Sequence, residues 1–336
     1  MLSTLLGGAA LTGCSEENPQ PTNGEGDQNP TSKTPTELYY ANMFGKEAMS
    51  TYYYWNKEIS SDLDNWNIDT NNDPIGTVDR IRYHQGDKYI DKWSILTDDM
   101  ASFNSSVEGV STTFGWNLTF YLVDKEKNQY VAVVNFVHKG TPAAKAGFKR
   151  GDIILSINDE KITPDNYADL YYKPTLKVSL GELQEDIIVS QNRSIELIAV
   201  NMYENPIICD SVYEFNGKKV GYLAYTGFDL KSINPLIEIG KKFKAEGIEE
   251  LVLDLRYNGG GYVITENVLA SMFAPQEAVS SKKVFEKEIY NSYLSEIYQK
   301  QGESLETRFT TEFNYPEVEV NASTKDANIG LKKSTD

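Results

Sequence analysis

A glycine turn late in the sequence has the composition of a site that stabilises negative charge. The apolar run Leu251 to Leu255 is followed by three glycines at positions 259–261, and then by a helical pattern through Phe273. We expect a buried strand, a tight turn and a helix N-terminus in this order. Glycines let backbone N–H groups lie close together, and a helix N-terminus adds partial positive charge. Such a turn can stabilise the oxyanion that forms when a nucleophile attacks a carbonyl group.

Two other anion-binding motifs do not fit this turn. A phosphate-binding P-loop requires Gly-Lys-Ser/Thr, but Tyr262-Val263-Ile264 follows the glycines. The dinucleotide fingerprint requires a third glycine at position 263, where the chain has valine. The remaining alternative is a turn that only connects two elements.

Asp254 to Gly261 reads Asp-Leu-Arg-x-Asn-Gly-Gly-Gly, which resembles the signature of the carboxyl-terminal processing, or tail-specific, serine peptidases. The resemblance implies peptide-bond hydrolysis through an acyl-enzyme, with a serine nucleophile and a lysine general base. We assign oxyanion stabilisation to Gly259 and Gly260, and support of the turn to Arg256 and Asn258. The resemblance implies no cofactor.

The catalytic serine and lysine of this family cannot be identified in the sequence. The family serine lies downstream of the turn, in a Ser-Ala-rich segment after an apolar strand. Residues 280–283 read Ser-Ser-Lys-Lys, but the family does not place the two residue types side by side, and the context favours a loop or strand edge. Residues 329–333 could open the required strand, yet the sequence ends at Asp336, and we do not assign Ser334 as the nucleophile. We expect the catalytic pair beyond Asp336; the alternative is a natural scaffold that has no chemistry.

Other catalytic chemistries lack a pattern. The two histidines, His84 and His138, fit surface or packing positions better than a Ser-His-Asp triad. The Asp and Glu residues show no diagnostic metal-ligand spacing, so we predict no metal site. Cys209, directly after the apolar Ile207 and Ile208, fits a small buried side chain and not a nucleophile.

A second motif predicts a peptide-binding domain. Thr141 can cap a short helix that begins at Pro142 and ends before a left-handed Gly147. Strands are expected at Tyr130 to Val137 and Ile153 to Ile157. The stretch from Gly140 to Asn158 closely resembles the core of a PDZ domain.

The segment Phe114-Gly115-Trp116-Asn117 resembles the PDZ loop that binds a terminal carboxylate, with Asn117 in place of the usual fourth glycine. Since Asn tolerates positive φ better than most residues, we expect the loop to form. The resemblance implies that protein or peptide C-termini are the partners, and that the peptide adds a strand to the sheet edge. A PDZ fold that only packs against its neighbour is the alternative.

The elements around these motifs can also be predicted. Phe44, Ala48 and Trp55 follow a helical period, which favours a small helical region before the PDZ domain. After it, a strand at Lys219 to Tyr225 leads to a helix with Asn234 as N-cap and Gly247 at its end, which buries one apolar side (Leu236, Ile237 and Phe243). The order strand, helix, strand, helix implies a parallel α/β layer.

The first 37 residues predict export and a lipid anchor. Leu11-Thr12-Gly13-Cys14 resembles the lipobox of bacterial lipoproteins, whose cysteine is acylated. Residues 15–37 contain four prolines and none of Leu, Ile, Val, Phe or another aromatic residue, so they cannot form a core and predict a flexible tether. The alternative is a cleaved signal peptide without a lipid.

The sequence thus predicts a multi-domain α+β protein. Its parts are a lipoprotein signal (1–14), a disordered tether (15–37), a helical region (38–109), a PDZ domain (110–200) and an incomplete α/β peptidase domain (201–336). We expect the cell envelope as the location, with the protein lipid-anchored to a bacterial membrane, on its periplasmic or surface side. The net charge of −17 argues against a nucleic-acid partner. The competing function is a non-catalytic peptide-binding lipoprotein or adaptor.

Overall fold

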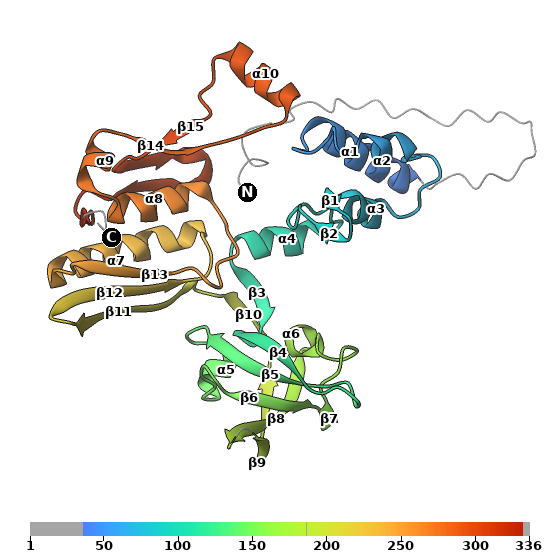
Figure 1. Cartoon of the computed structure of the whole chain (residues 1–336), viewed down its shortest axis with the longest axis vertical. Helices are drawn as coiled ribbons and strands as arrows, with labels where there is room; N and C mark the ends of the chain where they lie inside the picture. The colour runs from blue at the N-terminus through green and yellow to red at the C-terminus, as the bar shows by residue number, and fades with distance from the viewer. Residues whose placement is uncertain (1–35, 186, 332–336) are drawn as a thin grey trace, which may run out of the picture. The chain divides into compact units, whose positions relative to one another are not determined.

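A computed structural model describes residues 36–185 and 187–331. They form two compact units (Figure 1): the first comprises residues 36–99 together with Val284–Arg308, and the second comprises the described residues of 100–283 and 309–331. The predicted signal, its Cys14 and the tether up to residue 35 lie outside the described residues.

The first unit joins two distant parts of the sequence. Its N-terminal part contains helices α1 (Thr36–Thr51), α2 (Ser60–Asn65) and α3 (Pro74–Ile81) and a hairpin of β1 (His84–Gln85) and β2 (Lys88–Tyr89). Its later part contains β14 (Val284–Lys287), α10 (Ser292–Gln301) and β15 (Glu306–Arg308). Asn291 connects the two parts, because its Nδ2 donates to the carbonyl oxygens of Thr51 at 2.8 Å and Tyr53 at 3.0 Å. The predicted range 201–336 is therefore interrupted by a segment that packs with the helical region.

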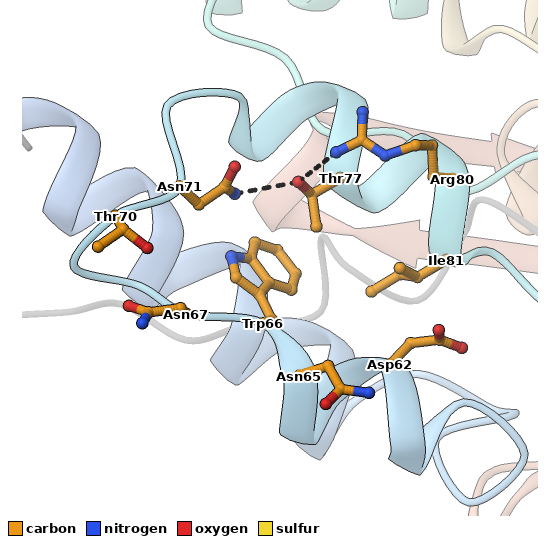
Figure 2. A pocket seen from close by; sticks show the side chains of 9 residues that line it. All are labelled: Asp62, Asn65, Trp66, Asn67, Thr70, Asn71, Thr77, Arg80 and Ile81. Carbon is orange, nitrogen blue, oxygen red and sulfur yellow. Dashed lines mark hydrogen bonds between the residues drawn. The ribbon is translucent and has the colours of Figure 1, made fainter.

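Helix α1 forms within the predicted helical region and packs on the core through residues other than Phe44. Phe44 is 64% exposed, whereas Asn42, Gly45 and Met49 are buried. The reason is Trp66, whose indole N–H donates to Asn42 Oδ1 at 2.7 Å and whose ring would lie 2.9 Å from a Cβ at position 45. Trp66 also lines an open pocket of about 300 Å³ beside α2 and α3 (Figure 2).

The PDZ sheet lies in the second unit. Its antiparallel strands follow the order β4 (Trp116–Asp124), β5 (Gln129–Val137), β6 (Ile153–Ile157), β8 (Thr175–Gln184) and β9 (Ile187–Ile198), with β7 (Glu160–Lys161) paired to β6. The predicted cap is confirmed: Thr141 Oγ1 accepts the N–H of Ala144 at 3.3 Å, α5 (Pro142–Lys145) follows, and Gly147 has φ +87°. The second short helix of this domain, α6 (Asp169–Tyr172), lies along β4.

A two-stranded ribbon is formed by the segments that enter and leave the PDZ domain. Strands β3 (Val110–Thr113) and β10 (Val200–Tyr203) pair antiparallel, and helix α4 (Met100–Val107) precedes β3. Glu204, directly after β10, accepts hydrogen bonds from Ser111 Oγ at 2.7 Å and Thr113 Oγ1 at 2.9 Å.

The α/β layer follows the ribbon. Strands β12 (Lys218–Tyr225) and β13 (Glu250–Asp254) are parallel, as predicted, and β11 (Ile207–Phe215) is added antiparallel to β12. Helices α7 (Ile233–Glu246) and α8 (Val263–Phe273) lie on one side of these strands (Figure 1). The predicted apolar side of α7 is buried, but the capping carboxylate comes from Asp229, which accepts the N–H of Ser232 in η1 (Leu230–Ser232), and not from Asn234.

Two expectations for this layer are wrong. The strand at Leu251 to Leu255 forms, but it is largely exposed, with Leu253 37% exposed, because β13 is the outer strand of the three-stranded sheet. No strand begins at Ile329 within the described residues; Ile329 instead donates its N–H to Met272 O at 2.9 Å and packs on the core. The remaining elements are α9 (Gln276–Ser280), β16 (Glu312–Tyr315), η2 (Pro316–Val318) and β17 (Val320–Ser323).

Candidate functional site

The carboxyl end of β13 holds a fixed ion pair. Arg256 donates to Asp254 through Nε at 2.9 Å and Nη2 at 2.6 Å, and the Tyr222 hydroxyl donates to Asp254 Oδ2 at 2.7 Å. The hydrogen bonds from Arg256 hold the pKa of Asp254 far below its usual range. Asp254 is therefore a stable anion near neutral pH, which suits it to position Arg256 and not to transfer protons.

The glycine turn packs against the segment that follows β12. Phe228 donates its N–H to Gly260 O at 2.8 Å, and Tyr262 returns its N–H to Phe228 O at 2.7 Å. Gly261 has φ +137°, and a Cβ there would lie 2.3 Å from Phe228 O. Only glycine fits this position, since both the backbone angle and the space exclude a side chain.

Both predicted oxyanion donors have partners within the chain. The N–H of Gly259 donates to Thr226 O at 3.2 Å, and the N–H of Gly260 donates to Asn258 Oδ1 at 2.8 Å. Asn258 also donates from Nδ2 to Tyr225 O at 3.2 Å, so its amide joins the turn to β12. The Gly260 N–H can bind an oxyanion only after its hydrogen bond to the Asn258 side chain breaks. The assignment of Gly259 and Gly260 as oxyanion donors stays a prediction.

A cavity of about 390 Å³ lies beside the turn, between the PDZ sheet and the α/β layer. Arg150, from the PDZ side, donates to Asn135 O at 2.7 Å and to the Tyr257 hydroxyl at 3.1 Å. The Tyr257 ring lies 5.2 Å from that of Phe136. Cys209 also lines this cavity and is partly exposed, contrary to the expectation of a buried side chain, with its Sγ 3.4 Å from Ser211 Oγ.

The predicted carboxylate loop begins at a buried aromatic residue and a left-handed glycine. Gly115 has φ +85°, donates its N–H to Thr113 Oγ1 at 2.7 Å and accepts the N–H of His138 at 2.8 Å. Phe114 is buried and accepts the N–H of Ala143 at 2.9 Å. The loop therefore closes against the N-terminus of α5.

The other two residues of this loop belong to β4. Trp116 is buried and donates its indole N–H to Leu170 O at 2.9 Å. Asn117 pairs with Phe136 and accepts a hydrogen bond from Asn135 Nδ2 at 2.8 Å. It has no positive φ, so the conformational tolerance expected of Asn117 is not needed. The peptide-binding role of residues 114–117 stays a prediction.

The Ser-Ser-Lys-Lys run at residues 280–283 begins at the last residue of α9, and residues 281–283 form the turn before β14, in line with the expected loop or strand edge. The hydroxyls of Ser280 and Ser281 donate to Glu277 O at 3.3 Å and 2.6 Å, and Lys283 Nζ pairs with Glu277 Oε1 at 3.0 Å. These contacts close a helix end. Ser334 lies outside the described residues.

The histidines occupy two different environments. His84 is exposed, and its Nδ1 lies 2.8 Å from Gly86 O. His138 is buried, with Nδ1 3.0 Å from Asn205 O and its ring 5.2 Å from that of Phe136. The described part of the chain contains no group of three or more His, Cys, Asp or Glu residues arranged to bind a metal ion. None of the helices in ranges 36–185 and 187–331 has the length and apolar character of a transmembrane span.

The sequence did not reveal the residues that surround the turn. Thr226, in the loop after β12, accepts the N–H of Gly259, and Tyr222 of β12 donates to Asp254 just before the turn; both lie about thirty residues earlier in the chain. The parallel pairing of Ala224 with Asp254 brings them together. The strand pattern could have indicated this pairing, but not the contact of a particular tyrosine.

Two family models match the chain. Residues 133–174 match the PDZ domain, and residues 219–318 match peptidase family S41. These matches confirm the predicted multi-domain α+β class.

Similar proteins include a probable CtpA-like serine protease of Staphylococcus aureus, 25% identical over 179 residues that cover 53% of this chain and 34% of the relative. A carboxyl-terminal-processing protease of Picosynechococcus is 25% identical over 146 residues, covering 42% of this chain and 34% of the relative. The chain thus spans about a third of the length of these curated relatives. Among solved structures, a putative S41 protease from Bacteroides fragilis shares the fold, with a TM-score of 0.52 and 21% identity, over 86% of this chain and 69% of that one.

Proposed function

Because the chain belongs with the carboxyl-terminal processing proteases that carry a PDZ domain, we propose that it serves as a serine-type endopeptidase of the cell envelope. The observation that carries this proposal is the glycine turn, which is built around Gly261 and adjoins a cavity bordered by the PDZ domain. Hydrolysis would proceed by attack of a serine hydroxyl on the peptide carbonyl, with a lysine accepting the proton.

We place the serine and the lysine outside the described residues, since the pair near position 280 closes a helix end. The 336-residue chain is accordingly expected to cleave neither unfolded casein nor C-terminally tagged peptides. The protein to compare is a longer product, made by continuing the same reading frame past the Asp336 codon. This longer product should cleave both casein and the tagged peptides. Gly260→Val in that longer product keeps the backbone N–H but cannot hold the φ of +102° at this position, so the donor moves; kcat should fall about 10²- to 10³-fold if the Gly260 N–H stabilises the oxyanion.

A non-catalytic peptide-binding lipoprotein is the second candidate. The bond from the Gly260 N–H to Asn258 Oδ1 favours it, because a donor with an internal partner is not available to an oxyanion. A stop codon directly after Asp336, or a continued product without activity, would support this candidate. Cleavage by the 336-residue chain itself, abolished by Ser281→Ala or Ser334→Ala, would contradict our placement of the nucleophile.

We further propose that the PDZ domain recognises protein C-termini through residues 114–117 and the edge of β4. Titration of the full chain with apolar-ended peptides, each as free acid and as C-terminal amide, tests this. Loss of the hydrogen bonds to the carboxylate, at about 1.5–3 kcal/mol, predicts roughly 10- to 150-fold weaker binding of the amides. Equal affinities would leave the domain as a packing element.

A further inference from the structure

The outer edge of β4 is already occupied at one residue. Leu118 lies opposite Val134 of β5, but Val134 directs its N–H and C=O to Asp152 and Gly151 on its other side, at 2.9 Å each. The N–H and C=O of Leu118 therefore point away from β5. Both meet the hydroxyl of Tyr171, which accepts the N–H at 3.2 Å and donates to the C=O at 3.4 Å.

A single side-chain hydroxyl thus satisfies the two backbone groups that a pairing strand would use. Tyr171 is held in this position by its surroundings. Trp116 anchors helix α6 to β4 through Leu170 O at 2.9 Å, and the Tyr171 ring lies 6.5 Å from that of Phe120. The next residue, Tyr172, is 84% exposed, so α6 places one tyrosine against the strand and its neighbour in solvent.

We infer that Tyr171 is a gate of the peptide groove: an extended peptide can pair with Leu118 only after the hydroxyl of Tyr171 leaves that residue. This gate rests on the proposed recognition of peptide C-termini, and it would limit the affinity for the peptide. The ligand class is an extended peptide with a free terminal carboxylate, which replaces the bonds of the hydroxyl with main-chain bonds. The closed state competes with this ligand, so weakening the closed state strengthens binding.

Tyr171→Phe in the full chain tests the gate, and Tyr172→Phe is the matched control. The phenylalanine keeps the ring but removes both hydrogen bonds to Leu118. At ordinary hydrogen-bond strength, free-acid peptides ending in Val, Leu or Phe should bind about 2- to 12-fold tighter to Tyr171→Phe than to the wild type. Tyr172→Phe should bind within about twofold of the wild type, because its hydroxyl is exposed. Fluorescence anisotropy with labelled peptides gives these ratios.

Hydrogen exchange of the Leu118 amide reports on its bond to Tyr171 in the absence of peptide. Exchange should be slow in the wild type and in Tyr172→Phe, and faster in Tyr171→Phe. A Leu118 amide that exchanges in the folded wild type like a free amide would overturn the gate, even if Tyr171→Phe failed to fold.

The two proposals fail in different ways. Unchanged or weaker acid binding by a folded Tyr171→Phe, with acids still preferred over amides, rejects the gate and leaves C-terminal recognition intact. Equal binding of acids and amides, or none by any variant, rejects C-terminal recognition, and the gate is rejected with it because nothing is then gated.

Discussion

Gly261 is the residue on which the shape of the candidate oxyanion turn depends. We predict that Gly261→Ala lowers the free energy of unfolding by about 2–3 kcal/mol, since a Cβ would meet Phe228 O at 2.3 Å in a backbone region that side chains avoid. Gly259→Ala is the matched control: nothing lies within 4 Å of its added Cβ, so we expect a change within about 0.5 kcal/mol. Urea unfolding of both variants measures the difference; equal midpoints would show that the turn can relax.

The ion pair at Asp254 should contribute to acid stability. Because its pKa is depressed in the folded protein, the unfolded chain takes up a proton first as the pH falls below about 3.9. Its contribution is present above that pH and is lost as the pH falls toward the lower folded pKa. We therefore expect a shallower decline of stability between about pH 4 and pH 2 in Asp254→Asn than in the wild type.

The exposed Asp64 of α2 offers a control for the charge change itself. Asp64→Asn should retain the wild-type acid slope. Denaturant titrations at several pH values give the slopes, and a slope in Asp254→Asn as steep as that of the wild type would contradict the prediction.

Single residues were predictable where the backbone alone decides them. The glycine turn at 259–261 and the helix cap at Thr141 follow from local patterns. In the structure, Gly260 and Gly261 have positive φ and Thr141 caps its helix. Tyr171 and Tyr222 could not be assigned, since a tyrosine in a chain with 22 of them carries no signal until the strand it faces is known.

Strand β13 exposes apolar side chains along an edge to which no other strand of the described residues pairs. Val252 and Leu253 are 48% and 37% exposed, and an edge of this kind is a template for pairing with another chain. We predict that Leu253→Lys reduces concentration-dependent association without loss of the fold. Light scattering over a concentration series measures this effect. Leu183→Lys, at an exposed apolar position of β8, should leave association unchanged, and an equal effect of both would point to net charge as the cause.

Elements were predictable in kind more often than in orientation. Helix α8 and strands β6 and β12 lie close to their expected limits because periodicity and caps mark them. The buried side of α1 could not be predicted, because Asn42 and Gly45, which look unsuited to a core, are the residues that accommodate Trp66. The exposure of β13 was missed because an apolar run does not report whether another strand covers it.

At the scale of the whole molecule, chain order and packing order differ. Residues 284–308 belong to the same compact unit as the N-terminal helices, although residues on either side of them belong to the other unit. Asn291 explains part of this grouping through its bonds to Thr51 and Tyr53. No local sequence pattern shows that residues 284–308 pack with the N-terminal helices, so domains predicted one after another along the chain could not include this packing.

Attachment to a membrane is the property of the whole molecule that the sequence most directly predicts. If Cys14 is acylated after export, wild-type protein made in a bacterium that processes lipoproteins should incorporate an alkyne-labelled fatty acid and fractionate with membranes. Stable anchoring takes two or more acyl chains, so the expected shift is from mostly membrane-bound to mostly released in Cys14→Ser. Cys209→Ser is the control, because the chain has two cysteines and only Cys14 lies in the lipobox-like segment. If the wild type and Cys14→Ser show the same soluble fractionation and neither takes up label, the chain is not anchored through Cys14, and a cleaved signal without lipid becomes the better interpretation.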